Sequence, residues 1–140
     1  MHVFLDSNVL FSACMRERSR QFALFALAEA GRCRLITSDY ALNEAKRNLA
    51  RKAPHPSPAL PALTMSITLS PDAPEDLIAW AGLQGLPLKD APILAAAVAA
   101  RAGLLVTGDR RHVGPLFGRT LRGVRVLSPA EGLAAVLTAR

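Results

Sequence analysis

Short apolar runs alternate along this chain with longer segments that carry apolar residues at helical spacing. Runs of strand length are followed by Asp, Ser, Thr or Gly, and we expect strands at residues 2–5, 33–37, 65–69, 104–106 and 124–127. Between the runs, apolar side chains recur every three or four residues, as on one face of a helix. Alternation of strands and helices predicts a central parallel sheet with helices on both faces, which is a three-layer α/β/α fold.

Capping residues place the ends of the predicted helices. Ser7, Ser38 and Ser128 each precede a helical segment, and Asp72 with Glu75 three residues later resembles a capping box. Gly103 follows the most apolar segment and is expected to end it. The predicted helices span 7–13, 18–30, 38–52, 72–83, 90–100 and 133–139, and the fifth is apolar on every side, as expected of a buried central helix.

A proline-rich segment interrupts the pattern between residues 53 and 71. It holds five prolines, so it cannot continue the preceding helix and is expected to form a loop or a broken short helix up to residue 63. Nothing in it marks the start of a second domain. We therefore expect one domain over residues 1–140, a length sufficient to bury a single core.

Composition and charge narrow the class of protein. The chain is 51% hydrophobic and 20% charged, which is typical of a globular domain, and its formal net charge of +6 favours a polyanionic partner. Basic residues near the predicted ends of helices are candidates for RNA contacts, although such residues also serve as ordinary solvated faces. The selected candidates are Arg16, Arg18, Lys46, Arg47, Arg110 and Arg111, and the same substrate path could include Arg20, Arg51 and Lys52.

The apolar runs also indicate the cellular location of the protein. Asp6 interrupts the first apolar run, so no secretion signal is predicted, and the longest uncharged run is too rich in proline to span a membrane. We expect a cytoplasmic protein without a membrane partner. Cys14 and Cys33 have neither the number nor the spacing of a disulfide framework or a zinc site.

Four acidic residues occupy positions that differ from a solvated face. Asp6 and Asp109 follow strand runs, Glu44 lies on the helix after the second strand, and Asp90 opens the most apolar helix. At a separation of about 5 Å and an effective dielectric constant of about 20, each pair of carboxylates repels by roughly 3 kcal/mol, so a cluster needs protons or a cation. Ligands that are all carboxylate oxygens suit Mg²⁺ or Mn²⁺.

Four motifs occur in a fixed order along the chain. They are VFLDSNVL at 3–10, Thr37-Ser38 with Asn43-Glu44, Lys89-Asp90 before the apolar run at 93–97, and LVTGD at 105–109 followed by VLSP at 126–129. Together they resemble the PIN-domain nucleases, which include the VapC-like toxins of bacterial toxin–antitoxin pairs. The resemblance extends from Val3 to Ala135.

This resemblance implies a metal-dependent endoribonuclease that leaves 3′-hydroxyl and 5′-phosphate ends. Its acidic quartet would be Asp6, Glu44, Asp90 and Asp109, holding Mg²⁺ or Mn²⁺, with Ser7, Asn8 and Thr107 as supporting residues. Asp6 and Asp90 are expected to bind the metal directly, and Glu44 either to bind metal or to position the attacking water. The implied partners are RNA, an antitoxin protein and a second copy of the chain, for which residues 22–28 offer an apolar face.

Two departures and two alternatives accompany the resemblance. Ser7 stands where the family more often has threonine, and Arg110-Arg111-His112 after Asp109 contains no further acid, so the sequence leaves the number of metal ions open.

A phosphatase with an aspartate nucleophile is disfavoured because Asn8 stands where such sites have a second acid. A non-catalytic module that binds RNA or an antitoxin is the other alternative. Each acid could also be structural, with Asp6 and Asp90 as helix caps and Glu44 as an exposed helix acid.

Overall fold

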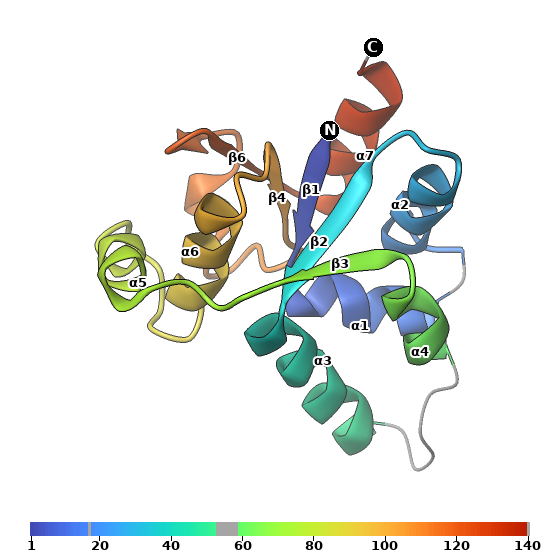
Figure 1. The fold of residues 1–140 in the computed structure, drawn as a ribbon, viewed down its shortest axis with the longest axis horizontal. Coiled ribbons are helices and arrows are strands. Elements are labelled where there is room, and N and C mark those ends of the chain that lie inside the picture. Colours follow the sequence, from blue (N-terminus) through green and yellow to red (C-terminus); the bar gives the residue numbers. More distant parts are fainter. Residues whose placement is uncertain (17, 53–58, 140) are drawn as a thin grey trace.

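A six-stranded sheet runs through the middle of the computed structural model, which describes residues 1–16, 18–52 and 59–139 (Figure 1). The strand order is β3-β2-β1-β4-β6-β5, and every neighbouring pair is parallel except β5 with β6. The strands are β1 (His2–Leu5), β2 (Arg34–Ser38), β3 (Ile67–Ser70), β4 (Leu104–Val106), β5 (Thr120–Leu121) and β6 (Val124–Leu127).

Helices cover both faces of this sheet, so the expected α/β/α architecture is confirmed. α5 and α6 lie on one side, and α1, α2 and α7 lie on the other (Figure 1). The helices are α1 (Ser7–Met15), α2 (Arg20–Glu29), α3 (Asp39–Lys52), α4 (Ala59–Thr64), α5 (Glu75–Gly82), α6 (Ala91–Ala99) and α7 (Pro129–Thr138), with a 3₁₀ turn, η1 (Gly114–Leu116).

Alternate residues of the central strands supply two separate cores. Val3 and Leu5 point toward α1, α2 and α7, whereas Phe4 between them packs against α6 on the other face. All three are fully buried. Burying such side chains contributes roughly 1.5–3 kcal/mol each, so the register of β1 is firmly fixed.

One close contact sets the distance between α7 and the sheet. A Cβ atom added at Gly132 of α7 would lie 2.6 Å from Cγ2 of Val106 in β4. Only glycine fits at this separation without movement of the strand. Gly132 therefore brings the amino-terminal end of α7 close to the carboxyl end of β4.

Some of the expected caps are different in the structure. Ser7 is the first residue of α1, and Asp6 is its cap, since a side-chain oxygen of Asp6 accepts a hydrogen bond from the Ser7 N–H. The capping box expected at Asp72 is wrong, because α5 begins after Pro74 without a side-chain cap and Asp72 accepts from the Tyr40 N–H at the start of α3. The box formed by Ser128 and Glu131 is confirmed.

The strand β5 was not expected from the sequence. It pairs with β6 across the two residues Arg122 and Gly123, whose φ angles are +46° and +85°. Positive φ at both central positions is the geometry of a tight hairpin turn, but arginine is an unusual choice for the first of them. The guanidinium of Arg122 lies 4.3 Å above the Trp80 ring, a contact that favours this conformation.

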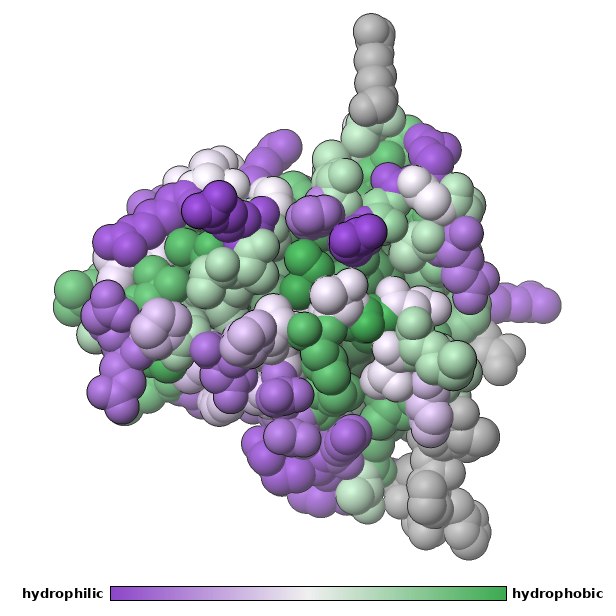
Figure 2. Space-filling model, in the orientation of Figure 1, coloured by the Kyte–Doolittle hydropathy of each residue, from purple (hydrophilic) through white to green (hydrophobic). Residues whose placement is uncertain are grey.

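The proline-rich segment is described only from Ala59 onward. There it forms the short helix α4, which suits the expected broken helix, and the part at 53–58 lies outside the described residues. α6 ends at Ala99 with Ala100 as its cap, and the left-handed residue that terminates it is Arg101, with a φ of +56°, and not Gly103 as expected. Figure 2 shows hydrophilic side chains gathered over α3, which ends in Arg51 and Lys52. Within the described ranges, no helix has both the length and the apolar character required to cross a membrane.

Candidate metal centre

The carboxyl ends of two neighbouring strands, β1 and β4, form the base of the candidate site. Asp6 follows β1, Thr107 follows β4, and Leu5 and Val106 are paired in the sheet, so Asp6 and Thr107 emerge side by side. The backbone N–H of Asp6 donates to the Val106 carbonyl at 3.1 Å. Parallel strands end at the same edge of a sheet, which is where ligands of open α/β folds bind.

Asp6 is a buried carboxylate with several donors around it. Its side chain accepts from the Ser7 N–H at 2.6 Å, from the Thr107 hydroxyl at 2.8 Å and from the Asn8 amide at 3.3 Å. Burial nevertheless outweighs these donors, and with the nearby charges of Asp90 and Glu44 it raises the pKa of Asp6 to about 6. The site is therefore suited to a cation that would compete with this proton.

Asn8 joins the first helix to the loop after β4. Its Oδ1 accepts from the Gly108 N–H at 2.8 Å, and its amide nitrogen lies 3.3 Å from the Thr107 hydroxyl oxygen. Gly108 permits this approach, since an added Cβ would lie 3.3 Å from Asn8 Oδ1. Asn8 and Thr107 thus hold the two strand ends in one arrangement, which is compatible with their expected supporting role.

Glu44 reaches the site from the first half of α3. The Ser7 hydroxyl donates to Oε1 of Glu44 and also lies 3.3 Å from Oδ1 of Asp6. Ser7 is buried and Glu44 is half-buried. Ser7 therefore links two of the expected acids through its side chain.

Asp90 stands at the N-cap position of α6, immediately before Ala91, but its side chain does not cap the helix. Its side chain makes no capping hydrogen bond, it is 7% exposed, and Oδ2 has no hydrogen-bond partner among the described residues. Burial raises the pKa of Asp90, and Asp109 and Glu44 act in the same direction against the lowering effect of Lys89. A buried carboxylate oxygen without a partner is costly, so it fits a position where a cation binds.

Asp109 is held by His112, three residues later. Oδ1 of Asp109 accepts from the His112 N–H at 3.0 Å, and Oδ2 lies 3.1 Å from Nδ1 of the imidazole. Burial acts to raise the pKa of Asp109, but the hydrogen bonds and charge of His112 outweigh it and lower the pKa. Within the described residues, ligand atoms of Asp90, Asp109 and His112 all lie within 4.8 Å of one another.

The four expected acids line a single open cavity of about 520 Å³. Their oxygen atoms, the unpartnered Oδ2 of Asp90 and the raised pKa values of Asp6 and Asp90 fit a hard divalent cation such as Mg²⁺ or Mn²⁺. Three cationic side chains also line the cavity and could contact a phosphate beside the cation. The lining residues are Asp6, Ser7, Asn8, Glu44, Arg47, Asn48, Arg51, Lys89, Asp90, Gly108 and Asp109.

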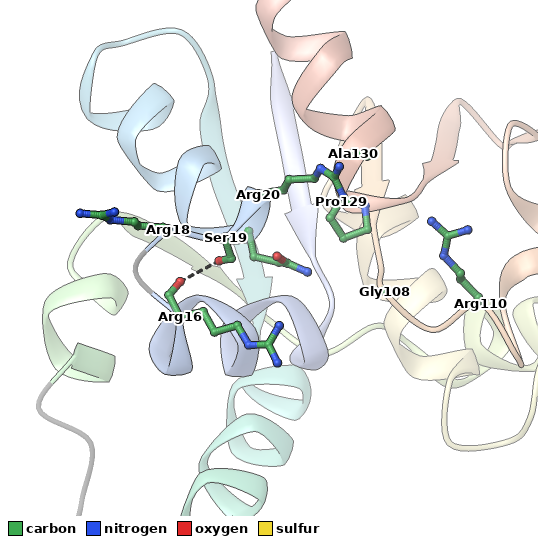
Figure 3. A pocket seen from close by; sticks show the side chains of 9 residues that line it. Arg16, Arg18, Ser19, Arg20, Gly108, Arg110, Pro129 and Ala130 are labelled. Atoms are coloured by element: carbon green, nitrogen blue, oxygen red, sulfur yellow. Dashed lines mark hydrogen bonds between the residues drawn. The ribbon is translucent and has the colours of Figure 1, made fainter.

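A second cavity, of about 660 Å³, is rich in arginine and includes the same Gly108. Figure 3 shows Arg20 extending toward the start of α7, with Arg16 and Arg110 on other sides and Arg18 directed away. Gly108 thus joins a cavity lined by acids to one lined by arginines. Of the six basic residues selected from the sequence, Arg16, Arg18 and Arg110 line this second cavity, Arg47 lines the first, and Lys46 and Arg111 line neither.

Comparison with known families decides the class of this protein. The family model of the PIN domain matches residues 2–111 of the 140. The chain belongs to the PIN-domain family. This membership confirms the resemblance seen in the sequence motifs.

Solved structures support the PIN fold of the whole chain. PAE2754 from Pyrobaculum aerophilum superposes with a TM-score of 0.70 at 17% identity, over 99% of this chain and 97% of that one. VapBC2 from Rickettsia felis, bound to a DNA fragment from its promoter, gives 0.67 at 16% identity over 91% and 98%. A toxin–antitoxin complex from Klebsiella pneumoniae gives 0.62 at 20% identity over 91% and 97%. No curated protein sequence matches the chain.

The sequence predicted no role for two residues near the acids, Lys89 and His112. Lys89 lines the acidic cavity, and His112 lies against Asp109. The spacing of His112 three residues after an aspartate at a strand end was the available signal, because such residues share one turn. Arg51 and Arg20, which we expected from the sequence to lie along a substrate path, line the acidic cavity and the arginine cavity respectively.

Proposed function

We propose that this PIN-domain protein is a metal-dependent endoribonuclease. The observation that carries the proposal is the convergence of Asp6, Glu44, Asp90 and Asp109 on one cavity, with an unpartnered carboxylate oxygen at Asp90. Such a cluster of buried acids is costly without a cation. A divalent ion beside cationic side chains would stabilise the charge that develops during hydrolysis of a phosphodiester.

The residues divide into those that would hold the cation and those that would position them. Asp6 and Asp90 are the direct ligands in this proposal, while Asp109 contributes from the loop after β4 and Glu44 orients the attacking water. Ser7, Asn8 and Thr107 fix the ligands through the hydrogen bonds described above. A bound Mg²⁺ or Mn²⁺ would supply Lewis acidity and neutralise charge that develops on the phosphate.

The arginine cavity supports RNA as the polyanionic substrate. Arg16, Arg20 and Arg110 would contact phosphates next to the one being cleaved, and Arg47, Arg51 and Lys89 would contact the scissile phosphate. Contacts of this kind position a nucleic acid without reading its sequence. The route from one set to the other passes Gly108, which both cavities share.

Partners follow from the proposed place of this protein in a toxin–antitoxin pair. The Klebsiella pneumoniae neighbour is described as a toxin–antitoxin complex, VapBC2 is bound to a DNA fragment from its promoter, and VapC20 from Mycobacterium tuberculosis is described as a toxin that cleaves the sarcin–ricin loop. We propose a cytoplasmic toxin that is restrained by an antitoxin and forms a homodimer. The apolar face at residues 22–28 offers less surface to a second copy than the sequence suggested, because Leu24 and Phe25 are buried in the core of the same chain.

The decisive experiment is RNA cleavage with purified protein. Structured and single-stranded RNA would be incubated with Mg²⁺, with Mn²⁺ or with EDTA, and the ends of the products sequenced. Cleavage should require the ion and leave 5′-phosphate ends. Asp6→Asn and Asp90→Asn should each reduce the rate by at least about a hundredfold, since each removes a proposed ligand charge.

Asp76→Asn is the matched control for these variants. Asp76 is exposed in the first turn of α5 and lines neither cavity, so the same change of charge there should leave the rate unaltered. Equal activity of the wild type and both site variants would overturn the proposal. RNA binding without cut ends in either ion would instead favour the non-catalytic binding module.

A further inference from the structure

The imidazole of His112 is the one nitrogen donor in a cluster that otherwise offers oxygen. Its Nδ1 lies 3.1 Å from Oδ2 of Asp109, and a ligand atom of Asp90 lies within 4.8 Å of both. We infer that His112 is a ligand of the catalytic cation, and that this nitrogen gives the site a preference for Mn²⁺ over Mg²⁺. The inference deepens the proposed metal-dependent function and rests on it.

The distance between the two donor atoms suits a shared ion. Two neighbouring ligands of an octahedral ion with bonds of about 2.1 Å lie about 3 Å apart. Nδ1 of His112 and Oδ2 of Asp109 are already at that separation. The His112 backbone N–H, which donates to Oδ1, holds the other oxygen of the same carboxylate. Asp109 is therefore oriented with Oδ2 beside the imidazole.

Asp90 supplies an independent reason to place a cation here. Only 7% of its surface is exposed, and its Oδ2 lacks a hydrogen-bond partner among the described residues. A carboxylate oxygen left in this state needs a positive charge nearby. His112 and Asp109 are the neighbouring groups that complete a mixed set of ligands around it.

The chemistry of the donors leads to the metal preference. Mg²⁺ binds oxygen ligands almost exclusively in proteins, whereas imidazole nitrogen binds transition-metal ions well. A site of two carboxylates and one imidazole therefore gains affinity for Mn²⁺ that Mg²⁺ does not gain. Asp6 and Glu44 line the same cavity as Asp90 and Asp109 and offer further oxygen ligands, which keep the site compatible with either ion.

Electron paramagnetic resonance of bound Mn²⁺ tests the ligand directly, without RNA. Tag-free protein would be loaded with one equivalent of Mn²⁺, and electron spin-echo modulation from a directly bonded ¹⁴N would be recorded. The wild type should show this coupling, and His112→Ala should lose it. In calorimetric titrations, His112→Ala should weaken Mn²⁺ binding about tenfold and Mg²⁺ binding less than about twofold.

Two further variants separate a ligand from a positioning residue. His112→Gln can still donate a hydrogen bond to Asp109 but offers no imidazole nitrogen, so it should bind Mn²⁺ as weakly as His112→Ala. His2→Gln, at the opposite end of β1, should keep the nitrogen coupling. Full Mn²⁺ affinity in His112→Gln, or bound Mn²⁺ without nitrogen coupling in the wild type, would overturn this inference alone. Absence of any Mn²⁺ or Mg²⁺ binding would overturn the proposed function as well.

Discussion

The Thr107 hydroxyl donates its single proton to Oδ2 of Asp6, at 2.8 Å, across 101 residues of chain. The hydroxyl oxygen of Thr107 itself accepts from the Asp109 N–H at 3.2 Å and lies 3.3 Å from the Asn8 amide nitrogen. Both of these neighbours are donors, so Asp6 is the acceptor for the Thr107 proton. This direction favours the ionised form of Asp6. Thr107 thereby partly offsets the effect of burial on that carboxyl group.

Replacement of Thr107 by valine should weaken metal binding. The shape of the side chain is kept, but Asp6 loses a donor, its pKa rises further, and protons compete better with the cation. We expect about a tenfold loss of Mn²⁺ affinity at pH 7, measured by calorimetry. Thr107→Ser retains the hydroxyl and should stay close to the wild type. Unchanged affinity in Thr107→Val would show that this hydrogen bond does not support the site.

The pH dependence of stability without metal should follow Asp6. Its pKa is raised from 3.8 to about 6 in the folded protein, so the folded state holds the proton more tightly than the unfolded state does. The contribution of Asp6 is therefore most favourable below pH 4 and is lost as pH rises through about 6. The full loss for this shift is about 3 kcal/mol.

Urea unfolding of the wild type and Asp6→Asn, with EDTA, measures this effect. The difference in free energy of unfolding between the two proteins should change by about 3 kcal/mol in favour of Asp6→Asn between pH 3.5 and pH 8. Mn²⁺ should restore the wild type at pH 8 and have little effect on the variant. A difference that is constant with pH would contradict the raised pKa.

The arginine cavity should control substrate affinity more than the rate of cleavage. Arg20→Ala with Arg110→Ala should raise KM for RNA and leave kcat within about twofold, because phosphate contacts bind the ground state and transition state alike. Loss of two phosphate contacts should reduce the slope of log affinity against log salt by about 1.4. Arg34→Ala is the control, since Arg34 is exposed at the amino end of β2 and lines neither cavity. If Arg34→Ala raised KM as much per residue as the cavity variants do, RNA affinity would depend on the overall positive charge of the protein and not on this cavity.

The packing of α7 on β4 predicts a contrast between two helical glycines. Gly132→Ala places a methyl group 2.6 Å from Val106, so it should destabilise the fold by about 1–3 kcal/mol. Gly82→Ala meets no atom within 4 Å in α5 and should be neutral or stabilising by up to about 1 kcal/mol. Thermal unfolding of both variants checks the prediction. Equal melting temperatures would mean that the helix moves away at little cost.

Much of the fold could be predicted because buried parallel strands have short, continuous apolar sequences. The run at 104–106 and the apolar helix after Asp90 are examples in which tertiary burial and local pattern agree. The motifs around the four acids also predicted which carboxylates share a cavity. The catalytic and metal-binding roles of these residues stay predictions until metal binding and cleavage are measured.

Other features depended on contacts that no local pattern encodes. Asp72 has the spacing of a cap for its own helix, yet it binds the start of α3, 32 residues earlier. Arg122 takes a left-handed conformation beside Gly123, and its position over Trp80 could not be read from the turn itself. His112 lies three residues after Asp109, but the proximity of both to Asp90, about twenty residues earlier, could not be read from that spacing.

The position of β1 between β2 and β4 has a consequence for biosynthesis. Asp6 is synthesised about a hundred residues before Thr107 and Asp109, which follow β4 and lie beside it in the folded protein. Such non-local pairing delays folding until most of the chain is available. A nascent chain or a truncated fragment that ends before Asp109 therefore lacks one of the four acids of the cavity, so we expect the proposed cleavage of RNA only after the loop that follows β4 has been made.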